Sequence, residues 1–128
     1  MSRKPIQFID EGLVKTTVTR GKQRRFEVYI TDMDGIAHDP DVCYLDLIKE
    51  GIRRDDSPVG PYSCIKVGAT GHWGTDPHLS ESMSLGDWIA RFFWRINGVP
   101  DGEDFNFVVE DLVQPYVDQP VVFYRRPV

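Results

Sequence analysis

The stretch between Gly86 and Gly98 constrains the fold of this chain more than any other. Its even-numbered positions are apolar: Trp88, Ala90, Phe92, Trp94 and Ile96. Its odd-numbered positions mix apolar residues with two arginines. A period of two in aromatic and β-branched residues is typical of a β-strand with one buried face. The stripe with two tryptophans therefore predicts a strand whose even face looks into a hydrophobic core.

Further alternating segments extend this prediction to the whole chain. They are residues 26–31, 42–48, 62–67 and 105–110, with a short β-favouring patch at 16–19 and a shorter candidate strand at 78–83. Turns rich in Gly, Pro and Asp separate them, and apolar residues never recur at helical spacing over more than two turns. Six or seven such strands are typical of an all-β, antiparallel β-sandwich, with a small barrel as the alternative.

The charge of the chain is unevenly distributed. Its 128 residues fit one domain, and 41% hydrophobic content argues against wholesale disorder. Residues 1–25 hold seven bases and two acids, whereas residues 26–128 hold eight bases and eighteen acids. The acidic body argues against nucleic acid as a partner. The basic arm, whose strongest cluster contains Arg24 and Arg25, could dock on the acidic body of a neighbouring copy or be a solvated tail.

Neither an apolar leader nor a run of about 18 apolar residues is present, so we expect no secretory signal and no membrane contact. The two cysteines, Cys43 and Cys64, lie in apolar runs that resemble strands. This favours buried free thiols made in a reducing compartment, and a disulfide across adjacent strands is the alternative.

Four aspartates surround one turn: Asp32, Asp34, Asp39 and Asp41. An Asp-x-Asp-Gly sequence begins like a calcium-binding loop, but the remaining EF-hand ligand positions and the flanking helices are absent. We therefore favour a turn stabilised by its carboxylates, with a calcium site in a sandwich loop as the alternative.

Residues 68–78 are predicted to form a long loop that carries His72, Trp73 and His78. Their spacing does not match a zinc signature, so we interpret the histidines as exposed loop residues. Trp73 could anchor a binding partner or fold back on the end of the sandwich. No nucleophile motif and no phosphate-binding loop occurs in the sequence. We expect no enzymatic activity, no cofactor, no metal and no small-molecule substrate.

The last seventeen residues are rich in Val, Phe and Tyr and are interrupted by three prolines, which argues against a helix or a central strand. Tyr116, Phe123 and Tyr124 would expose apolar surface if this segment were free. It could form an edge strand on its own domain or bind a neighbouring copy, and we favour the neighbour. The predicted organisation is a basic arm at 1–24, a sandwich at 25–111 and an apolar arm at 112–128.

Several motifs follow one another in a characteristic order over residues 25–111. They are Phe26-x-Val-x-Ile, Asp-Met-Asp-Gly35, Asp39-Pro40-Asp41-Val42, Gly60-Pro61-Tyr62, Gly86-Asp87-Trp88, Phe93-x-Arg95 and Phe105-x-Phe107. This order resembles a family of small Ig-like domains in structural proteins of tailed bacteriophages, from which the long loop at 68–77 departs.

The resemblance implies an Ig-like or fibronectin-like antiparallel β-sandwich with extended arms. It also implies a non-enzymatic virion protein of the neck, of the head as a decoration protein, or of the tail or baseplate. The partners would then be other copies of itself and other virion proteins. The alternative function is a binding module for a glycan or a receptor that uses the 68–78 loop, and a small metal-dependent enzyme ranks third.

Overall fold

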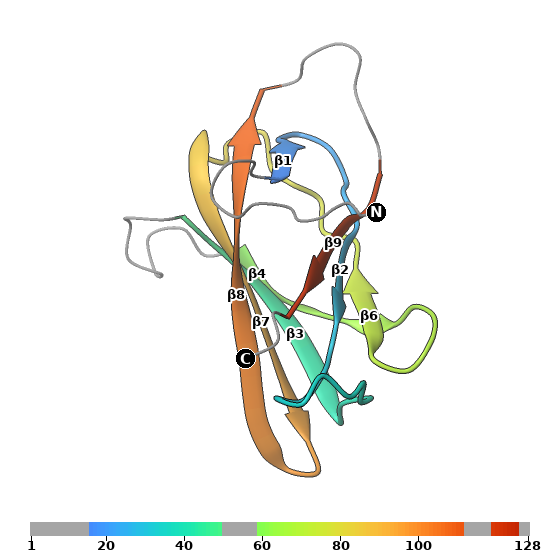
Figure 1. Ribbon diagram of the computed structural model, residues 1–128. Coiled ribbons are helices and arrows are strands. Elements are labelled where there is room, and N and C mark those ends of the chain that lie inside the picture. Colours follow the sequence, from blue (N-terminus) through green and yellow to red (C-terminus); the bar gives the residue numbers. More distant parts are fainter. Residues whose placement is uncertain (1–15, 50–58, 112–118, 126–128) are drawn as a thin grey trace, which may run out of the picture.

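The computed structural model describes residues 16–49, 59–111 and 119–125 of the chain. These residues form nine strands in two sheets and no helix (Figure 1). The strands are β1 (Thr16–Thr19), β2 (Phe26–Tyr29), β3 (Val42–Lys49), β4 (Val59–Ser63), β5 (Ile65–Lys66), β6 (His72–Thr75), β7 (Gly86–Ile96), β8 (Val99–Glu110) and β9 (Val121–Tyr124). One sheet has the order β1-β8-β7-β3-β4 and the other β5-β6-β2-β9. The all-β prediction is confirmed, with two sheets packed together.

The hairpin of β7 and β8 is the longest paired unit of the fold. The two strands pair from Gly86 opposite Val109 to Ile96 opposite Val99. They are joined by Asn97 and Gly98, which both have positive φ angles, as two-residue hairpin turns require. The side chains on the even face of β7 are almost fully buried from Trp88 to Trp94. The strand predicted from the alternating tryptophans is thus confirmed, including the direction of its buried face.

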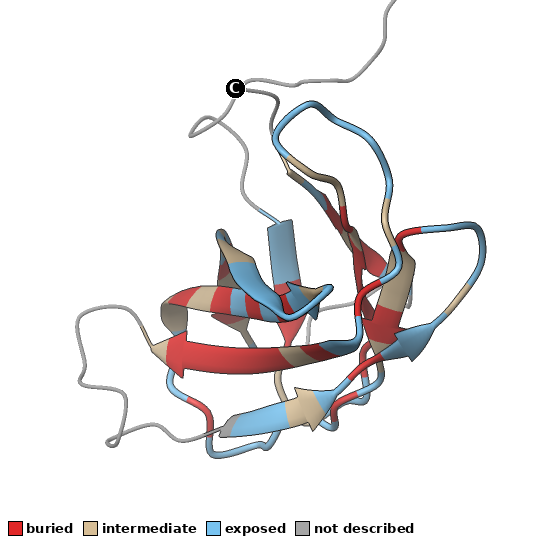
Figure 2. Cartoon of the chain, turned by 90° about the horizontal axis from the view of Figure 1, so that it is seen from below, coloured by how far each residue is buried: buried red, intermediate tan, exposed pale blue. Residues whose placement is uncertain are grey.

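The core lies between the facing sides of the two sheets, where Figure 2 shows the buried residues. Strands β2 and β3 contribute alternating apolar side chains, and Phe26 packs edge-on against Phe107 of β8. Phe123 of β9 stacks on Phe105 with 4.7 Å between the ring centroids. Because β9 supplies Phe123 to this aromatic cluster, the C-terminal strand is part of the core.

The prediction of purely antiparallel sheets is wrong at both ends of the chain. β1 runs parallel to β8, and β9 runs parallel to β2. Neither strand follows its partner directly in the sequence, so no tight hairpin forces an antiparallel pairing. The predicted arm boundaries also need correction. Val18 is fully buried and Val121 is 3% exposed, so parts of residues 1–24 and 112–128 belong to the sandwich.

The predicted strand at 62–67 is divided between the two sheets. β4 ends at Ser63 beside β3, and β5 begins at Ile65 beside β6. At the crossing, the Cys64 backbone N–H donates to the Cys43 carbonyl at 2.9 Å. Both cysteines are buried free thiols, as expected. A separate hydrogen bond between the two cysteine side chains, together with burial, raises the pKa of the Cys43 thiol.

The predicted long loop at 68–78 contains a strand, β6, which pairs with β2 and β5. Gly74 permits this close approach, because a Cβ atom there would lie 2.8 Å from the carbonyl oxygen of Phe26. Residues 78–83 form no strand, and only His78 makes an isolated bridge with Gln23. Leu79 and Met83 from this segment are nevertheless buried, so it closes the core without pairing in a sheet.

Candidate interaction surface

One end of the sandwich brings together a tight turn, the β7–β8 hairpin turn and the residue after β9. We call this end the tip and define it as residues 32–41, 96–103 and Arg125. Asp32 fixes its turn: Oδ1 accepts hydrogen bonds from the backbone N–H groups of Asp34 and Ile36 at 2.9 and 3.0 Å. Its Oδ2 lies 2.8 Å from Nε2 of His38. The hydrogen bond with His38 lowers the pKa of Asp32. Together, these three hydrogen bonds of the Asp32 side chain fix the conformation of the turn.

This fixed turn holds apolar side chains in water. Met33 and Ile36 are each 60% exposed, and Val99 of the neighbouring hairpin is 64% exposed. A hollow of about 300 Å³ is lined by Asp32, Met33, His38, Ile96, Asn97, Val99 and Asp101. Met33 and Val99 line the same hollow, and exposed apolar residues that lie together mark interaction sites more often than isolated ones. The tip is therefore the best candidate for an interaction surface in the described part of the chain.

Arg125 anchors the end of β9 to the tip. Its guanidinium group donates to both carboxylate oxygens of Asp101 at 2.8 Å and to the carbonyl oxygens of Thr31 and Gly102. It also pairs with Glu103 at 3.2 Å and lies 5.1 Å from the ring centroid of Trp94. The Arg125 side chain is only 5% exposed, and hydrogen bonding with Asp101 raises its pKa. This network fixes the position of the hairpin turn relative to β9.

The residues predicted in the apolar C-terminal arm have three different outcomes. Phe123 is 7% exposed and belongs to the core, whereas Tyr124 is 63% exposed. Tyr124 stacks on Tyr29 of β2 with 4.8 Å between ring centroids. Tyr116 lies outside the described residues. For residues 119–125, the preference for a neighbouring copy is wrong: their strand β9 pairs with β2 of the same chain, because Phe123 completes the core.

The three residues predicted in the 68–78 loop do not form one site. His72 and Trp73 are consecutive in β6, so their side chains point to opposite faces of the sheet. Nε2 of His72 lies 2.7 Å from Oε1 of Glu27, and its ring stacks on Tyr29. The Trp73 indole packs against the core, which is the second of the two predicted alternatives. His78 is exposed at the bridge to Gln23, away from both.

Arg24 and Arg25 are not part of a free basic arm, and that prediction is wrong. Arg24 is 8% exposed, and its Nε donates to the carbonyl oxygen of Gln119 at 2.5 Å. Nε of Arg25 lies 3.3 Å from Oε2 of Glu27. Earlier in the same segment, Arg20 pairs with Asp111 at 2.6 Å. These arginines hold the connection between β1 and β2 against the body of the sandwich.

Asp39, another of the four clustered aspartates, bonds to three groups outside its own turn. Its Oδ1 accepts from the backbone N–H of Gly71 at 2.9 Å and from the indole N–H of Trp73 at 3.1 Å, and its Oδ2 pairs with Lys66 at 2.8 Å. These bonds lower the pKa of Asp39 to about 2. Asp41 accepts from the backbone N–H of Gly98. Among the residues that the structure describes, no three acidic, His or Cys side chains converge as metal ligands would.

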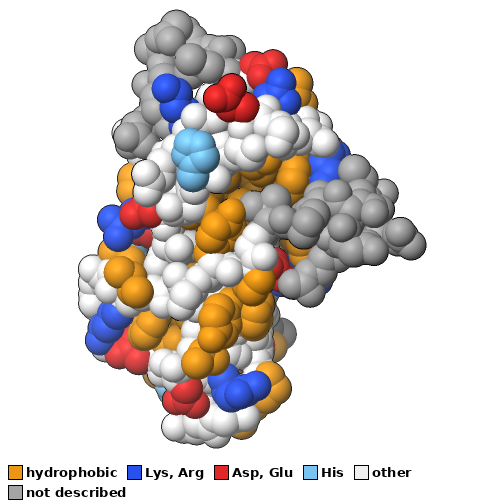
Figure 3. Space-filling view, turned by 180° about the vertical axis from the view of Figure 1, so that it is seen from behind, with side chains coloured by type: hydrophobic (Ala, Val, Ile, Leu, Met, Phe, Trp, Pro, Cys, Tyr) orange, Lys and Arg blue, Asp and Glu red, His pale blue; other side chains and the backbone are white. Residues whose placement is uncertain are grey.

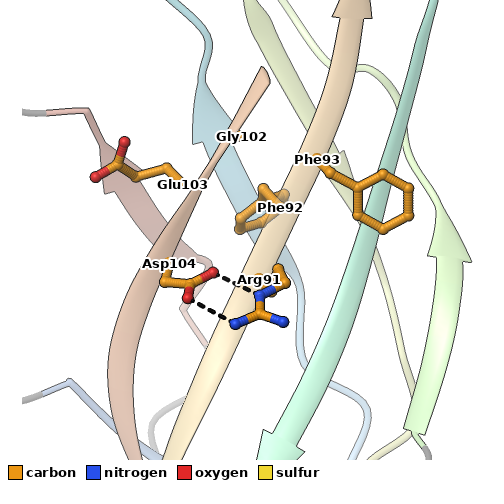
Figure 4. Close-up of a pocket in the computed structure, with 6 residues that line it drawn as sticks. All are labelled: Arg91, Phe92, Phe93, Gly102, Glu103 and Asp104. Atoms are coloured by element: carbon orange, nitrogen blue, oxygen red, sulfur yellow. Dashed lines mark hydrogen bonds and ion pairs between the residues drawn. The ribbon is translucent and has the colours of Figure 1, made fainter. Parts of the chain in front are cut away.

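The outer face of the β7–β8 hairpin has a second, shallower hollow of about 450 Å³ (Figure 4). It lies over Gly102 and is lined by Arg91, Phe92, Phe93, Gly102, Glu103 and Asp104. Arg91 and Asp104 bridge it with two hydrogen bonds of 2.8 and 2.9 Å. Phe93, which also lines this hollow, is 37% exposed and stacks on Tyr44. In the view from behind, hydrophobic side chains gather in the middle and lower part of the molecular surface (Figure 3).

Met33, Ile36, Val99 and Arg125 were not predicted as functional residues from the sequence. One signal was present, since turns usually carry polar residues and the turn at 32–37 contains Met33 and Ile36. No comparable signal marked Arg125, because a basic residue near a chain end is normally solvated.

No family model, curated protein or solved structure matches the chain. Within the described ranges we find no helix that could cross a membrane.

Proposed function

We propose that the chain is a non-enzymatic structural protein of a tailed-phage virion, which assembles with its own copies and with other virion proteins. One observation carries the proposal. Titratable side chains that could do chemistry are bound to one another between elements of the sandwich, whereas apolar side chains are exposed to water at the tip. The order of motifs over residues 25–111, which resembles Ig-like domains of phage structural proteins, supports the same setting.

The polar side chains are bonded to one another, which favours a structural role for them. Catalytic side chains converge on a point where a substrate can lie. Here Glu27 faces His72, Asp39 faces Lys66 and Trp73, and Arg125 faces Asp101. Each of these pairs joins two strands or a strand and a loop. Their geometry therefore fits residues that hold the sandwich together.

The apolar tip fits a surface that binds protein. Burying Met33, Ile36 and Val99 against a partner would remove apolar surface from water, which is favourable at roughly 25 cal/mol per Å². Because Asp32 already fixes the turn, little conformational entropy would be lost on binding. A preorganised apolar surface is what repeated assembly of identical subunits requires.

The test is the solution mass of the full-length chain, measured by light scattering over a range of concentrations. We expect an oligomer that is weakened by the double substitution Met33→Ser with Ile36→Ser. The matched control is Ile65→Ser, which removes an equally exposed apolar residue from β5. Deleting the C-terminal segment would be a poor test, because it also removes the buried side chains of β9.

A chain that stays monomeric at every concentration would contradict assembly through its own copies. The virion setting is tested separately, by mass spectrometry of particles purified from a lysate in which the chain is made. Stoichiometric amounts in the particles are expected, and absence from them would overturn the virion assignment.

A further inference from the structure

We propose that the tip binds residues 3–8 of a second copy of this chain, an inference that rests on the assembly function proposed above. The segment reads Arg-Lys-Pro-Ile-Gln-Phe and lies outside the described residues. It contains two bases, two large apolar residues and no acid. The segment is basic, whereas the tip is acidic. Both carry large apolar side chains that could pack against each other.

The tip carries more acid than base, even though Lys66 of β5 pairs with its Asp39. It contains six carboxylates and a single arginine. The carboxylates are Asp32, Asp34, Asp39, Asp41, Asp101 and Glu103. The one arginine, Arg125, is bound to Asp101 and Glu103 and is nearly buried. A basic segment would therefore meet a complementary potential, which favours encounter and fixes orientation.

The spacing of residues in the segment matches an apolar surface with an acidic rim. In an extended chain, Ile6 and Phe8 point to the same side and Gln7 to the other. Pro5 restricts Lys4 to extended conformations, which favours this arrangement before binding. The two apolar side chains would cover Met33 and Val99, and the two bases that precede them would face the carboxylates of the rim.

The geometry of the chain favours a second copy over the same copy. Thr16, where the described chain begins, lies opposite Phe107 of β8, eight residues from Val99. Eight residues of strand span about 27 Å. The eight residues from Phe8 to Thr16 reach about 26–29 Å only when fully extended. The same segment would therefore have to run straight along β8, beyond its pairing with β1, to reach its own tip.

Within the tip, that edge of β8 is interrupted for a continuing strand. Pro100 has no N–H group to donate, and the carbonyl oxygen of Gly102 accepts a hydrogen bond from Arg125. At these two positions the edge offers no free backbone group that would hold the segment in the extended conformation that it needs. A segment from a second copy approaches the tip without this constraint.

The experiment uses full-length chain with ¹³C-labelled methionine methyl groups. Met33 reports from the tip, while Met83, which is 4% exposed, serves as an internal control from the core. We compare the unmodified chain with the double substitution Arg3→Glu with Lys4→Glu, and with Ile6→Ser with Phe8→Ser. Ile65→Ser is the matched surface control. We expect the Met33 signal to shift with concentration in the unmodified chain and in Ile65→Ser. In both segment variants it should stay at its dilute-state position, and the oligomer mass should fall in parallel.

The outcomes separate this inference from the proposed function. If the segment variants still assemble and the Met33 shift persists, the inference is overturned while assembly stands. If the unmodified chain never assembles, the proposed function fails first. A Met33 shift that depends on the segment but not on concentration, in a monomer, would place the segment of the same copy on the tip. That result would also overturn the inference.

Discussion

Two adjoining segments of the fold, residues 68–75 and 32–37, differ in what their side chains contact. Those of the first bond within the chain, whereas apolar side chains of the second are exposed to water. The first segment has glycines, a histidine and a tryptophan, and its composition predicts an exposed binding loop. In the structure it forms β6, with His72 bound to Glu27 and Trp73 bound to Asp39. The second segment has the composition of an ordinary turn, yet it exposes Met33 and Ile36.

The difference arises from the partners of each segment. β6 lies between β2 and β5, so both of its edges are paired within the chain. Its two faces are engaged as well, because His72 bonds to Glu27 and Trp73 packs against the core. The turn at 32–37 bonds mainly to itself through Asp32, and its apolar side chains have no sheet to cover them. Chemical character alone therefore does not identify a binding residue. The groups around it decide whether it stabilises the fold or remains available to a partner.

The largest expected effect is that of Trp73→Ala. Trp73 packs against the core and donates to Asp39, although its indole is not fully buried. We expect the free energy of unfolding to fall by roughly 2–3 kcal/mol, less than the roughly 3–5 kcal/mol of a fully buried tryptophan. Denaturant unfolding measures this loss, and Trp73→Phe should recover most of it. A loss of less than about 0.5 kcal/mol, as at ordinary surface positions, would show that Trp73 does not stabilise the fold and is available to bind a partner.

A smaller effect is expected from Asp39 as pH falls. Its folded-state pKa is about 2, below the roughly 3.9 of an unfolded aspartate. Its contribution to stability is therefore complete above about pH 4 and is lost as pH falls towards 2. Asp32 and Asp101, whose pKa values are also lowered, add to the same trend.

The measurement for Asp39 is the free energy of unfolding against pH for the unmodified chain and for Asp39→Asn. The variant should be less stable near neutral pH and should lose less stability between about pH 4 and pH 2. The effect should weaken in high salt, because Lys66 and Asp39 are both substantially exposed. Identical pH profiles would mean that the Asp39 bonds do not hold β6 to the turn.

Local patterns in the sequence predicted the parts of the fold that depend on local alternation. The period-two pattern from Trp88 to Trp94 established both the strand and its buried face, because burial on one side of a sheet follows directly from that period. The Asp-Gly turn after β2 was equally readable. Short strands within Gly-rich sequence, such as β6, could not be predicted in this way. Gly74 is needed there because β2 passes close to it, and that closeness is not visible in the local sequence.

Parallel pairing and long-range ion pairs could not be read from the sequence. β1 and β9 pair with strands far away along the chain, and nothing in four residues specifies the direction of the partner. The same holds for Arg125, whose main partner Asp101 is 24 residues away. The apolar residues of the tip were visible in the sequence. Their exposure follows only from the position of the turn at the end of the sandwich.

The smallest effect on stability is expected at the tip, where the effect on assembly should be clearest. Met33→Ser with Ile36→Ser removes two exposed side chains while the hydrogen bonds of Asp32 remain, so unfolding should change by less than about 0.5 kcal/mol. Thermal and denaturant unfolding at a concentration where the chain is monomeric measure this change. A loss above about 1 kcal/mol would mean that these residues support the fold of the same chain. Residues 32–37 and Trp73 would then no longer differ, because both would stabilise the fold and neither would be available only for binding a partner.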